Sequence, residues 1–242
     1  MRPAAASVVL GLALAVGAPI AWAAAQPEAT AGAPLDQALE DPGTVAEAPS
    51  PSAAVPPATA VPPATAAAPP TTRSLPPVTV RDASPVVVPA APAPVRLDLP
   101  ARGISAPIDA VGVADDGQMA LPDDVARVGW YRFGPEPGAP GNAVVAGHVD
   151  DREQGRGALF ALRAAAPGDE LVVTDAVGSV SRWQVVSREL VHKQVLPLDE
   201  IFTREGPARL VVITCGGPFL PEYRSYQDNV VVVAEPVVDA TP

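Results

Sequence analysis

Apolar and polar residues begin to alternate at Val95, and the alternation continues almost to the C-terminus. Runs rich in Val, Ile and Leu are separated by turn sequences such as Asp115-Asp116-Gly117 and Pro167-Gly168-Asp169. A two-residue period with β-branched residues between Gly, Pro and Asp turns predicts β-strands. The runs predicted as strands are 96–99, 108–114, 119–121, 128–133, 142–148, 170–175, 179–191, 209–214 and 229–234. Many short strands, with helical turns only at 157–163 and 198–202, predict an all-β domain built as a closed barrel or a sandwich.

The chain before this region lacks the alternation and is rich in proline. Residues 26–94 hold 17 of the 32 prolines and contain the direct repeat VPPATA at 55–60 and 61–66. Proline at this density removes backbone donors and fixes φ, so we expect a disordered, partly polyproline II linker that serves as a stalk. The 148 residues from 95 to 242 are long enough for one self-sufficient folded domain.

The first 25 residues have the pattern of an export segment. Arg2 gives a positive start, residues 7–25 are uncharged and apolar, and Ala21-Trp22-Ala23 fits a signal-peptidase site. The apolar stretch is also about long enough to span a bilayer once, so both a cleaved signal peptide and a retained signal-anchor stay open. In either case we expect an extracytoplasmic protein, membrane-anchored or secreted.

Composition and charge narrow the function. The net charge is −11, and the predicted domain alone holds 13 basic and 21 acidic residues. Because phosphate binding needs a basic face, nucleic acid is not expected as a partner. The single cysteine, Cys215, has no partner for an internal disulfide in an exported chain. It is therefore either a small buried hydrophobic residue or a reactive thiol.

The surroundings of Cys215 favour a reactive thiol. The apolar run 210–214 ends at this residue, and Gly216-Gly217-Pro218 follows as a predicted turn. A thiol at a strand end lies at the rim of a domain, and the glycines would let a substrate backbone approach and leave N–H groups free for an oxyanion.

His148 has a matching position at the end of the apolar run 143–146, just before Asp150 and Asp151. A thiol has an ordinary pKa near 8.5, so a cysteine nucleophile needs a neighbouring base, and an imidazole can take its proton and return one to a leaving amine. A capping or core role for His148 stays open. The other histidine, His192, lies within a predicted hairpin and is a weaker candidate.

Other chemistries have little support in the sequence. The spacing of the two histidines and the cysteine fits no zinc pattern, and the acidic pairs at 115–116, 123–124 and 150–151 lack the EF-hand loop. A Gly-x-Ser-x-Gly elbow is absent from the sequence, which argues against a serine hydrolase. We therefore expect no metal and no cofactor, and leave calcium dependence open.

Several motifs together resemble the sortase family. Val212-Ile213-Thr214-Cys215 resembles its Thr-Cys signature strand, and Ala146-Gly147-His148-Val149-Asp150 resembles its histidine motif. The segments VGWY at 128–131, GNAV at 141–144, TCGG at 214–217 and DNVVV at 228–232 resemble the class F branch of high-GC Gram-positive bacteria. The likeness covers about residues 95–235, and the 67-residue separation of His148 from Cys215 adds to its specificity.

The resemblance implies an eight-stranded barrel and a transpeptidase reaction. Cys215 would attack the Thr–Gly-type bond of a Leu-Pro-x-Thr-Gly-like sorting signal, and an amine of a cell-wall precursor would resolve the thioester. His148 would be the proton donor and acceptor, with Thr214 and Gln227 lining the substrate site. The family also uses an arginine after the cysteine, and here the expected position holds Gln227. Arg224, three residues earlier, is the tentative replacement; without it the enzyme should be slow.

Two other functions stay open. One is another cysteine peptidase of the cell wall, such as an L,D-transpeptidase or a papain-like hydrolase, although the Ser-His-Gly-Cys cluster of the L,D-transpeptidases is absent from this sequence. The other is an exported binding module whose barrel has lost activity, which the Arg-to-Gln departure favours. We expect a monomer whose partners are a sorting-signal peptide, an amine acceptor and, through the N-terminal segment, the membrane.

Overall fold

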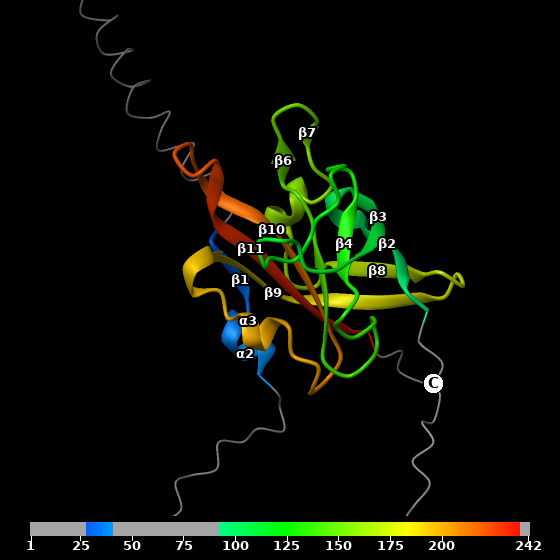
Figure 1. Cartoon of the computed structure of the whole chain (residues 1–242). Coiled ribbons are helices and arrows are strands. Elements are labelled where there is room, and N and C mark those ends of the chain that lie inside the picture. The colour runs from blue at the N-terminus through cyan, green and yellow to red at the C-terminus, as the bar shows by residue number, and fades with distance from the viewer. Residues whose placement is uncertain (1–27, 41–91, 238–242) are drawn as a thin grey trace, which may run out of the picture. The chain divides into compact units, whose positions relative to one another are not determined.

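The computed structural model describes residues 28–40 and 92–237, and its main body is a closed β-barrel (Figure 1). The barrel strands are β2 (Pro94–Leu99), β3 (Ile104–Val111), β4 (Val128–Tyr131), β5 (Asn142–Ala146), β8 (Glu170–Asp175), β9 (Val180–His192), β10 (Arg209–Leu220) and β11 (Ser225–Pro236). They pair in the order β9-β11-β10-β5-β4-β3-β2-β8, and pairing of β8 with β9 closes the ring. The predicted eight-stranded, mainly β fold is confirmed.

Several strand boundaries differ from prediction. β3 starts at Ile104, four residues before its predicted start, and the predicted strand at 119–121 is only a bridge between Val113 and Met119. β10 does not stop at Thr214 but runs on to Leu220, because β11 continues to pair with it. A two-stranded hairpin, β6 (Asp150–Asp151) with β7 (Gly155–Arg156), was not predicted, since strands of two residues carry no periodicity.

Helices are few and short within the part of the chain that the structure describes. The predicted helical turn at 157–163 is a 3₁₀ helix, η2 (Phe160–Ala164), and the one at 198–202 is α3 (Leu198–Ile201). The other 3₁₀ turns are η1 (Pro100–Arg102) and η3 (Lys193–Val195). Both predicted helical turns are thus present, shifted or shortened by a few residues.

The central strands are buried on both faces. In β10, Leu210 and Val212 belong to the barrel interior, whereas Val211 and Ile213 belong to a second apolar cluster on the outer face. β11 alternates in the same way, so its run Val230–Val233 is apolar throughout. A strand covered on both sides loses the polar half of its alternation, which explains the unbroken valine runs.

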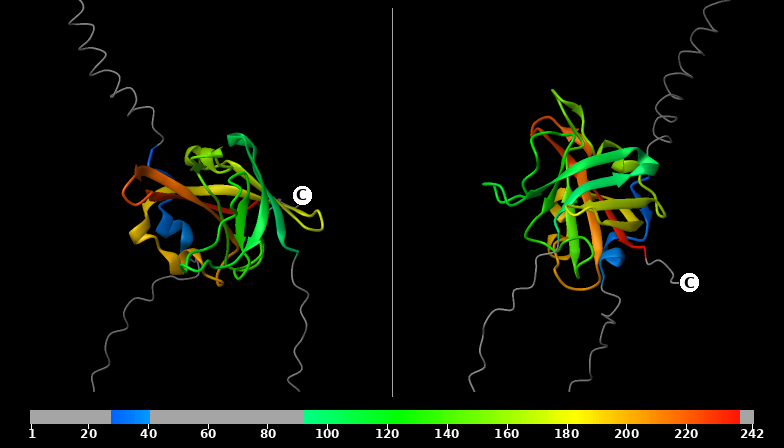
Figure 2. Two further views of the ribbon diagram at one scale, coloured as in Figure 1. Left: turned by 45° about the horizontal axis from the view of Figure 1, so that its top comes forward. Right: turned by 90° about the vertical axis from the view of Figure 1, so that its right-hand side faces the viewer.

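The outer face is covered by an N-terminal strap, which we define as residues 28–40. It contains β1 (Thr30–Gly32), which adds to the edge of β9, and helix α2 (Leu35–Leu39). Figures 1 and 2 show this blue segment lying against β9 and β11. Leu35, Ala38 and Leu39 are buried there among residues of the outer cluster.

Polar contacts fix both ends of the strap to the barrel. The buried guanidinium of Arg188 donates to the carbonyl of Glu28 at 2.7 Å, and that of Arg209 donates to the carbonyl of Glu40. Between them, the Leu35 N–H donates to the Glu189 carboxylate at 2.9 Å. Burial lowers the pKa of Arg188, and its donors are occupied by backbone carbonyls at both Nη1 and Nε.

The strap corrects the predicted linker. Residues 28–40, assigned above to a disordered 26–94 segment, form part of the fold. The apolar spacing of Leu35, Ala38 and Leu39 is that of one helical face, but five helical residues surrounded by proline give too short a periodic signal. Residues 92–94 of the predicted linker lead into β2. Residues 26–27 and 41–91 of the linker, and the export segment at 1–25, lie outside the described residues.

The predicted stalk falls on residues 41–91, outside the described ranges, and stays a prediction. Within the described ranges, no helix has the length and apolarity needed to cross a bilayer.

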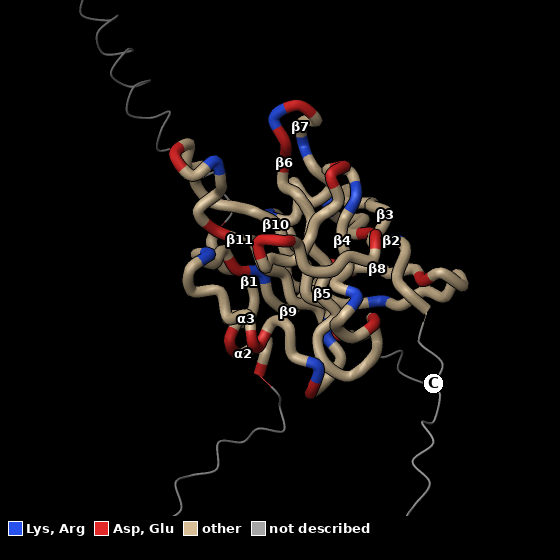
Figure 3. Tube along the Cα trace, viewed as in Figure 1, with Lys and Arg blue, Asp and Glu red and all other residues tan. Residues whose placement is uncertain are grey.

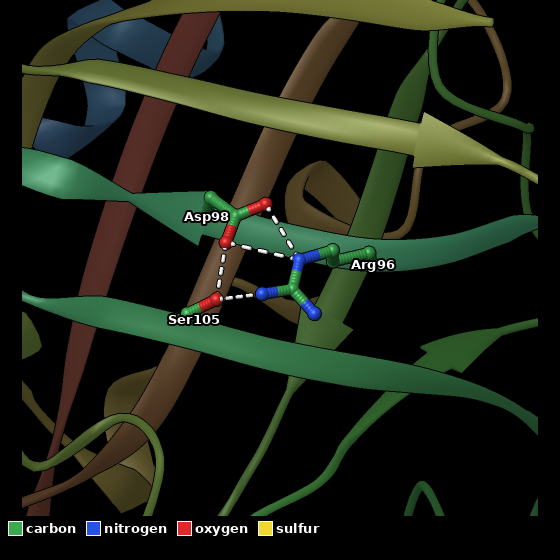
Figure 4. A network of polar contacts seen from close by, with 3 residues as sticks. All are labelled: Arg96, Asp98 and Ser105. Atoms are coloured by element: carbon green, nitrogen blue, oxygen red, sulfur yellow. Dashed lines mark hydrogen bonds and ion pairs between the residues drawn. The ribbon is translucent and has the colours of Figure 1, made fainter. Parts of the chain in front are cut away.

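Charged residues lie mostly in loops and at hairpin tips, and β5 carries none (Figure 3). On the surface of the β2–β3 hairpin, Arg96 bonds to Asp98 at 3.1 Å and to Ser105, whose hydroxyl donates to Asp98 (Figure 4). An exposed network of this kind contributes at most about 1 kcal/mol to stability. The charge-free strand β5 and the apolar run 210–213 of β10 lie side by side and form the apolar surface on which the site is built.

Candidate active site

His148 and Cys215 lie just beyond the point where two neighbouring parallel strands stop pairing. The β5–β10 ladder ends where Ala146 pairs with Ile213. Beyond it, the Gly147 N–H donates to the Ile213 carbonyl at 3.1 Å, and the Thr214 hydroxyl donates to the Gly147 carbonyl at 2.8 Å. These two hydrogen bonds join the two chain segments at Gly147, one residue before His148, and at Thr214, one residue before Cys215.

Cys215 does not end its strand, contrary to the sequence prediction. It pairs with Asn229 of β11, and β10 continues beyond it through an irregular register between Gly216 and Phe219. What ends at this point is the support from β5, so beyond Ile213 the hairpin of β10 and β11 extends past the barrel. Cys215 is half-buried, with a free thiol at the margin of the barrel.

The two glycines after Cys215 are required by packing. A Cβ on Gly216 would come within 2.9 Å of side-chain carbons of Val230 and Leu190. Gly217 has φ +71°, and a Cβ there would meet the Asp228 carboxylate. Protein atoms therefore occupy the space beside both glycines that was predicted to admit a substrate. The glycines instead allow the close packing and the β-bulge that follows Gly216.

An apolar groove of about 480 Å³ leads to the thiol and to Gly147. Its floor comes from β5 and β10, and its walls come from the loop after β3 and from the η3–α3 segment. The large apolar side chains that line it are Val113, Met119, Leu121, Tyr131, Leu196, Leu198, Phe202 and Ile213. Thr214, Cys215, Asn229 and Lys193 form its polar end.

Lys193, which the sequence analysis did not single out, contacts the thiol. Its Nζ lies 3.6 Å from Cys215 Sγ and 2.9 Å from Ser225 Oγ. Among the described residues, it is the only side chain with a polar contact to Cys215. The available signal was that this is the only lysine of the chain, at the end of a long amphipathic strand.

The segment after His148 is held by Asp150 and Asp151. The Tyr226 hydroxyl donates to Asp150 at 2.6 Å, and this bond to a carboxylate, with burial, raises the pKa of Tyr226 to about 12. The backbone N–H groups of Gln154 and Glu153 lower the pKa of Asp151, and the nearby His148 adds to this effect. His148 itself is half-buried, between Gly147 and the buried Val149.

Arg224 has no polar contact with the thiol in the described structure. Arg224 lies at the exposed tip of the β10–β11 hairpin with φ +49°, and its side chain has no polar contact with a described residue. Gln227 is half-buried in β11, two residues from Asn229 and so on the same side of the strand as Cys215's partner. His192 accepts a bond from the Gln194 N–H at 3.3 Å and starts η3, a capping position.

Metal ligands are not gathered at this site. In the described ranges, no three His, Cys, Asp or Glu side chains are placed to hold an ion.

The chain belongs to the sortase family: the sortase domain model matches residues 97–237, which span the barrel from β2 to the end of β11. The family makes this protein an enzyme that acts on peptides, a transpeptidase of the cell wall. The match excludes the strap, which lies before its first residue.

Solved structures similar to the chain are also sortases. Sortase C-1 from Actinomyces oris is 20% identical, with a TM-score of 0.47, covering 60% of this chain and 73% of that one. Sortase A from Listeria monocytogenes is 17% identical, with a TM-score of 0.46, covering 62% and 89%. Sortase C from Clostridium perfringens SM101 is 16% identical, with a TM-score of 0.44, covering 60% and 69%. A search of curated proteins gives no match.

Proposed function

We propose that this protein is an extracytoplasmic sortase that cleaves a Leu-Pro-x-Thr-Gly-like sorting signal and transfers the acyl part to an amine of the cell wall. Cys215 is the nucleophile and His148 the proton donor and acceptor. The observation that carries the proposal is the position of both residues directly beyond the end of the β5–β10 ladder, where Cys215 and Gly147, the neighbour of His148, line the polar end of the apolar groove.

The reaction has two halves. The Cys215 thiolate forms a C–S bond to the carbonyl carbon of the substrate threonine, and the carbonyl π pair moves to oxygen. When the pair returns, the C–N bond breaks and the imidazolium of His148 protonates the leaving amine. In the second half, an incoming amine attacks the thioester, gives its proton to His148 and releases the Cys215 thiolate.

The groove supports an extended, partly apolar peptide as substrate. Its large aliphatic and aromatic walls would bury a leucine and a proline, while the polar end beside Thr214 and Cys215 receives the scissile bond. Nothing in this chemistry needs a cofactor. The motifs at 128–131, 214–217 and 228–232 support a class F-like enzyme of actinobacterial type, and the apolar segment 7–25 supports action at the outer face of the membrane.

The test is cleavage of quenched fluorescent peptides by the full-length chain in detergent. We expect cleavage of at least one member of a Leu-Pro-x-Thr-Gly-like library, with a peptide product joined to added amine. Cys215→Ala should abolish cleavage, and His148→Ala should lower it by about 10² to 10⁴, the usual contribution of a general acid–base group.

A matched control is His192→Ala, which removes the other histidine at its capping position and should leave cleavage within about threefold of the wild type. An enzyme that cleaves no library member while its thiol is also inert to alkylation would refute the proposal. Full cleavage by the Cys215→Ala variant would do so as well.

A further inference from the structure

The lysine at the thiol carries an inference beyond the Cys–His pair. Lys193 Nζ lies 3.6 Å from Cys215 Sγ, and no other charged group of the described residues has a polar contact with this sulfur. Its second bond, at 2.9 Å to the Ser225 hydroxyl, fixes the ammonium, since Ser225 Oγ in turn donates to the Tyr226 carbonyl at 3.2 Å. The Ser225 hydroxyl on β11 therefore holds the Lys193 ammonium next to the sulfur.

The end of β9 brings Lys193 close to the thiol. Cys215, Asn229 and Val191 form one row across β10, β11 and β9, because Cys215 pairs with Asn229 and Asn229 pairs with Val191. His192 ends β9 and pairs with Asp228, and Lys193 follows it as the first residue of η3. The pairing of β9 with β11 therefore fixes where η3 begins, next to this row, and the 3.6 Å contact places the ammonium at the sulfur.

The charge of Lys193 is not neutralised by a carboxylate in the described structure, where no ion pair involves this residue. The other titratable groups of the neighbourhood are His148 after β5, Asp150 on β6, and Tyr226 and Asp228 on β11. The Tyr226 hydroxyl is hydrogen-bonded to Asp150, and the Asp228 carboxylate occupies the space that a Cβ on Gly217 would need. Arg224 is at the exposed hairpin tip, and the position where the resemblance leads one to expect an arginine holds neutral Gln227.

We propose that Lys193 is the catalytic cation of this enzyme, in the role for which the family uses an arginine. Its ammonium stabilises the Cys215 thiolate before attack, because an opposite charge within about 4–6 Å favours the charged form of a thiol. It also stabilises the oxyanion, since that oxygen is bonded to the carbon that Sγ attacks. Lys193 keeps its three protons throughout, while His148 carries all proton transfer. This role rests on the proposed sortase reaction, but its effect on the thiol can be measured without a substrate.

The first test is alkylation of the full-length chain by iodoacetamide at pH 7, followed by mass spectrometry. The reagent is neutral, and Cys215 is the only cysteine, so the rate reports this thiolate alone. Because the variant lacks the cation beside the sulfur, Lys193→Met should be alkylated about three- to fivefold more slowly than the wild type.

Two variants separate charge from structure. Lys193→Arg keeps the cation and should alkylate within about twofold of the wild type, whereas Arg182→Met removes a cation at the far end of β9 and should change nothing. If Lys193→Met does not fold, the lysine of the folded wild type can be modified chemically while Cys215 is protected as a reversible disulfide. After the thiol is released, acetylation of the lysine, which removes its charge, should slow alkylation of Cys215. Dimethylation, which keeps the charge, should not.

Peptide cleavage distinguishes this inference from the function on which it rests. With a cleaved peptide in hand, Lys193→Met should lower kcat/KM by about 10² or more, the usual loss for one oxyanion partner. A wild type that cleaves peptides, with Lys193→Met equal to it in both cleavage and alkylation, overturns the lysine and leaves the sortase reaction intact. A lysine-dependent alkylation rate in a protein that cleaves no peptide supports the cation and refutes the function.

Discussion

The Tyr226 hydroxyl donates a 2.6 Å hydrogen bond to Asp150, and this bond joins the segment after His148 to the strand that pairs with the Cys215 strand. Together with the Thr214–Gly147 bond on the other side of His148, it holds the imidazole segment at two points. The two contacts lie beyond the last β5–β10 pair, Ala146 with Ile213, where ladder pairing between these strands no longer fixes the distance. We infer that side-chain bonds, and not the sheet, maintain the site.

Tyr226→Phe tests the first of these bonds. The folded pKa of Tyr226, about 12, lies above the unfolded value of about 10, so the bond contributes stability below pH 10 that is lost as the pH rises through 12. We expect the variant to be less stable than the wild type at pH 7, and the difference to shrink between pH 10 and 12. Urea unfolding at several pH values measures this, with the exposed Tyr223→Phe as the control.

Absorbance titration of the phenols checks the same bond independently. One of the three tyrosines should titrate near pH 12 in the wild type, and that component should be missing from Tyr226→Phe. A component near 12 that persists in the variant would assign the raised pKa to another tyrosine.

Thr214→Val tests the second bond. The hydroxyl is buried, and its loss leaves the Gly147 carbonyl without this donor, which should cost about 1–3 kcal/mol of unfolding free energy. Peptide cleavage should fall by more than alkylation, because the thiol survives while the position of His148 relaxes. Thr214→Ser keeps the hydroxyl and should recover most of both. Equal losses in Ser and Val variants would show that the methyl group matters and the bond does not.

Gln227→Arg tests whether a cation can be supplied from β11. In the wild-type background we expect at most about a threefold change in cleavage, because Lys193 already provides the charge. In the Lys193→Met background the same substitution should recover part of the lost rate, since residue 227 leaves β11 on the same side as Asn229, the pairing partner of Cys215. Arg224→Ala, at the exposed tip, should leave cleavage unchanged. A large loss in that variant would return the role to Arg224.

Leu35→Ala tests the strap. Leu35 is 4% exposed in the outer cluster, and removing a buried leucine side chain costs about 2–5 kcal/mol. Val177→Ala, at a 72% exposed position, is the control and should stay within about 0.5 kcal/mol. A protein that begins at residue 92 should have a lower Tm than one that begins at residue 26, since it exposes the apolar outer face of β10 and β11. Equal Tm values would show that the strap does not stabilise the barrel.

The alternation from Val95 onward was enough to predict an all-β domain and most of its strands, because a two-residue period is a local property of the chain. Cys215 and His148 could be recognised from local sequence in the same way. Each follows an apolar run and comes shortly before residues typical of a turn or loop. Their order and separation then led to the sortase family, which the domain match confirms. Strand ends were less predictable, since β10 continues past Cys215 only because β11 continues to pair with it.

Contacts between distant residues were decided by the tertiary structure alone. Lys193 contacts Cys215 across 22 residues because the pairing of β9, β11 and β10 brings the end of β9 alongside Cys215, and the Leu35 N–H bonds to Glu189 across 154 residues. No local period encodes such a register, because pairing depends on which partner strand the closed barrel brings alongside. The sequence by itself therefore determined the fold class, the nucleophile candidate and the base candidate. The tertiary structure decided which cation faces the thiol and that the N-terminal strap belongs to the fold.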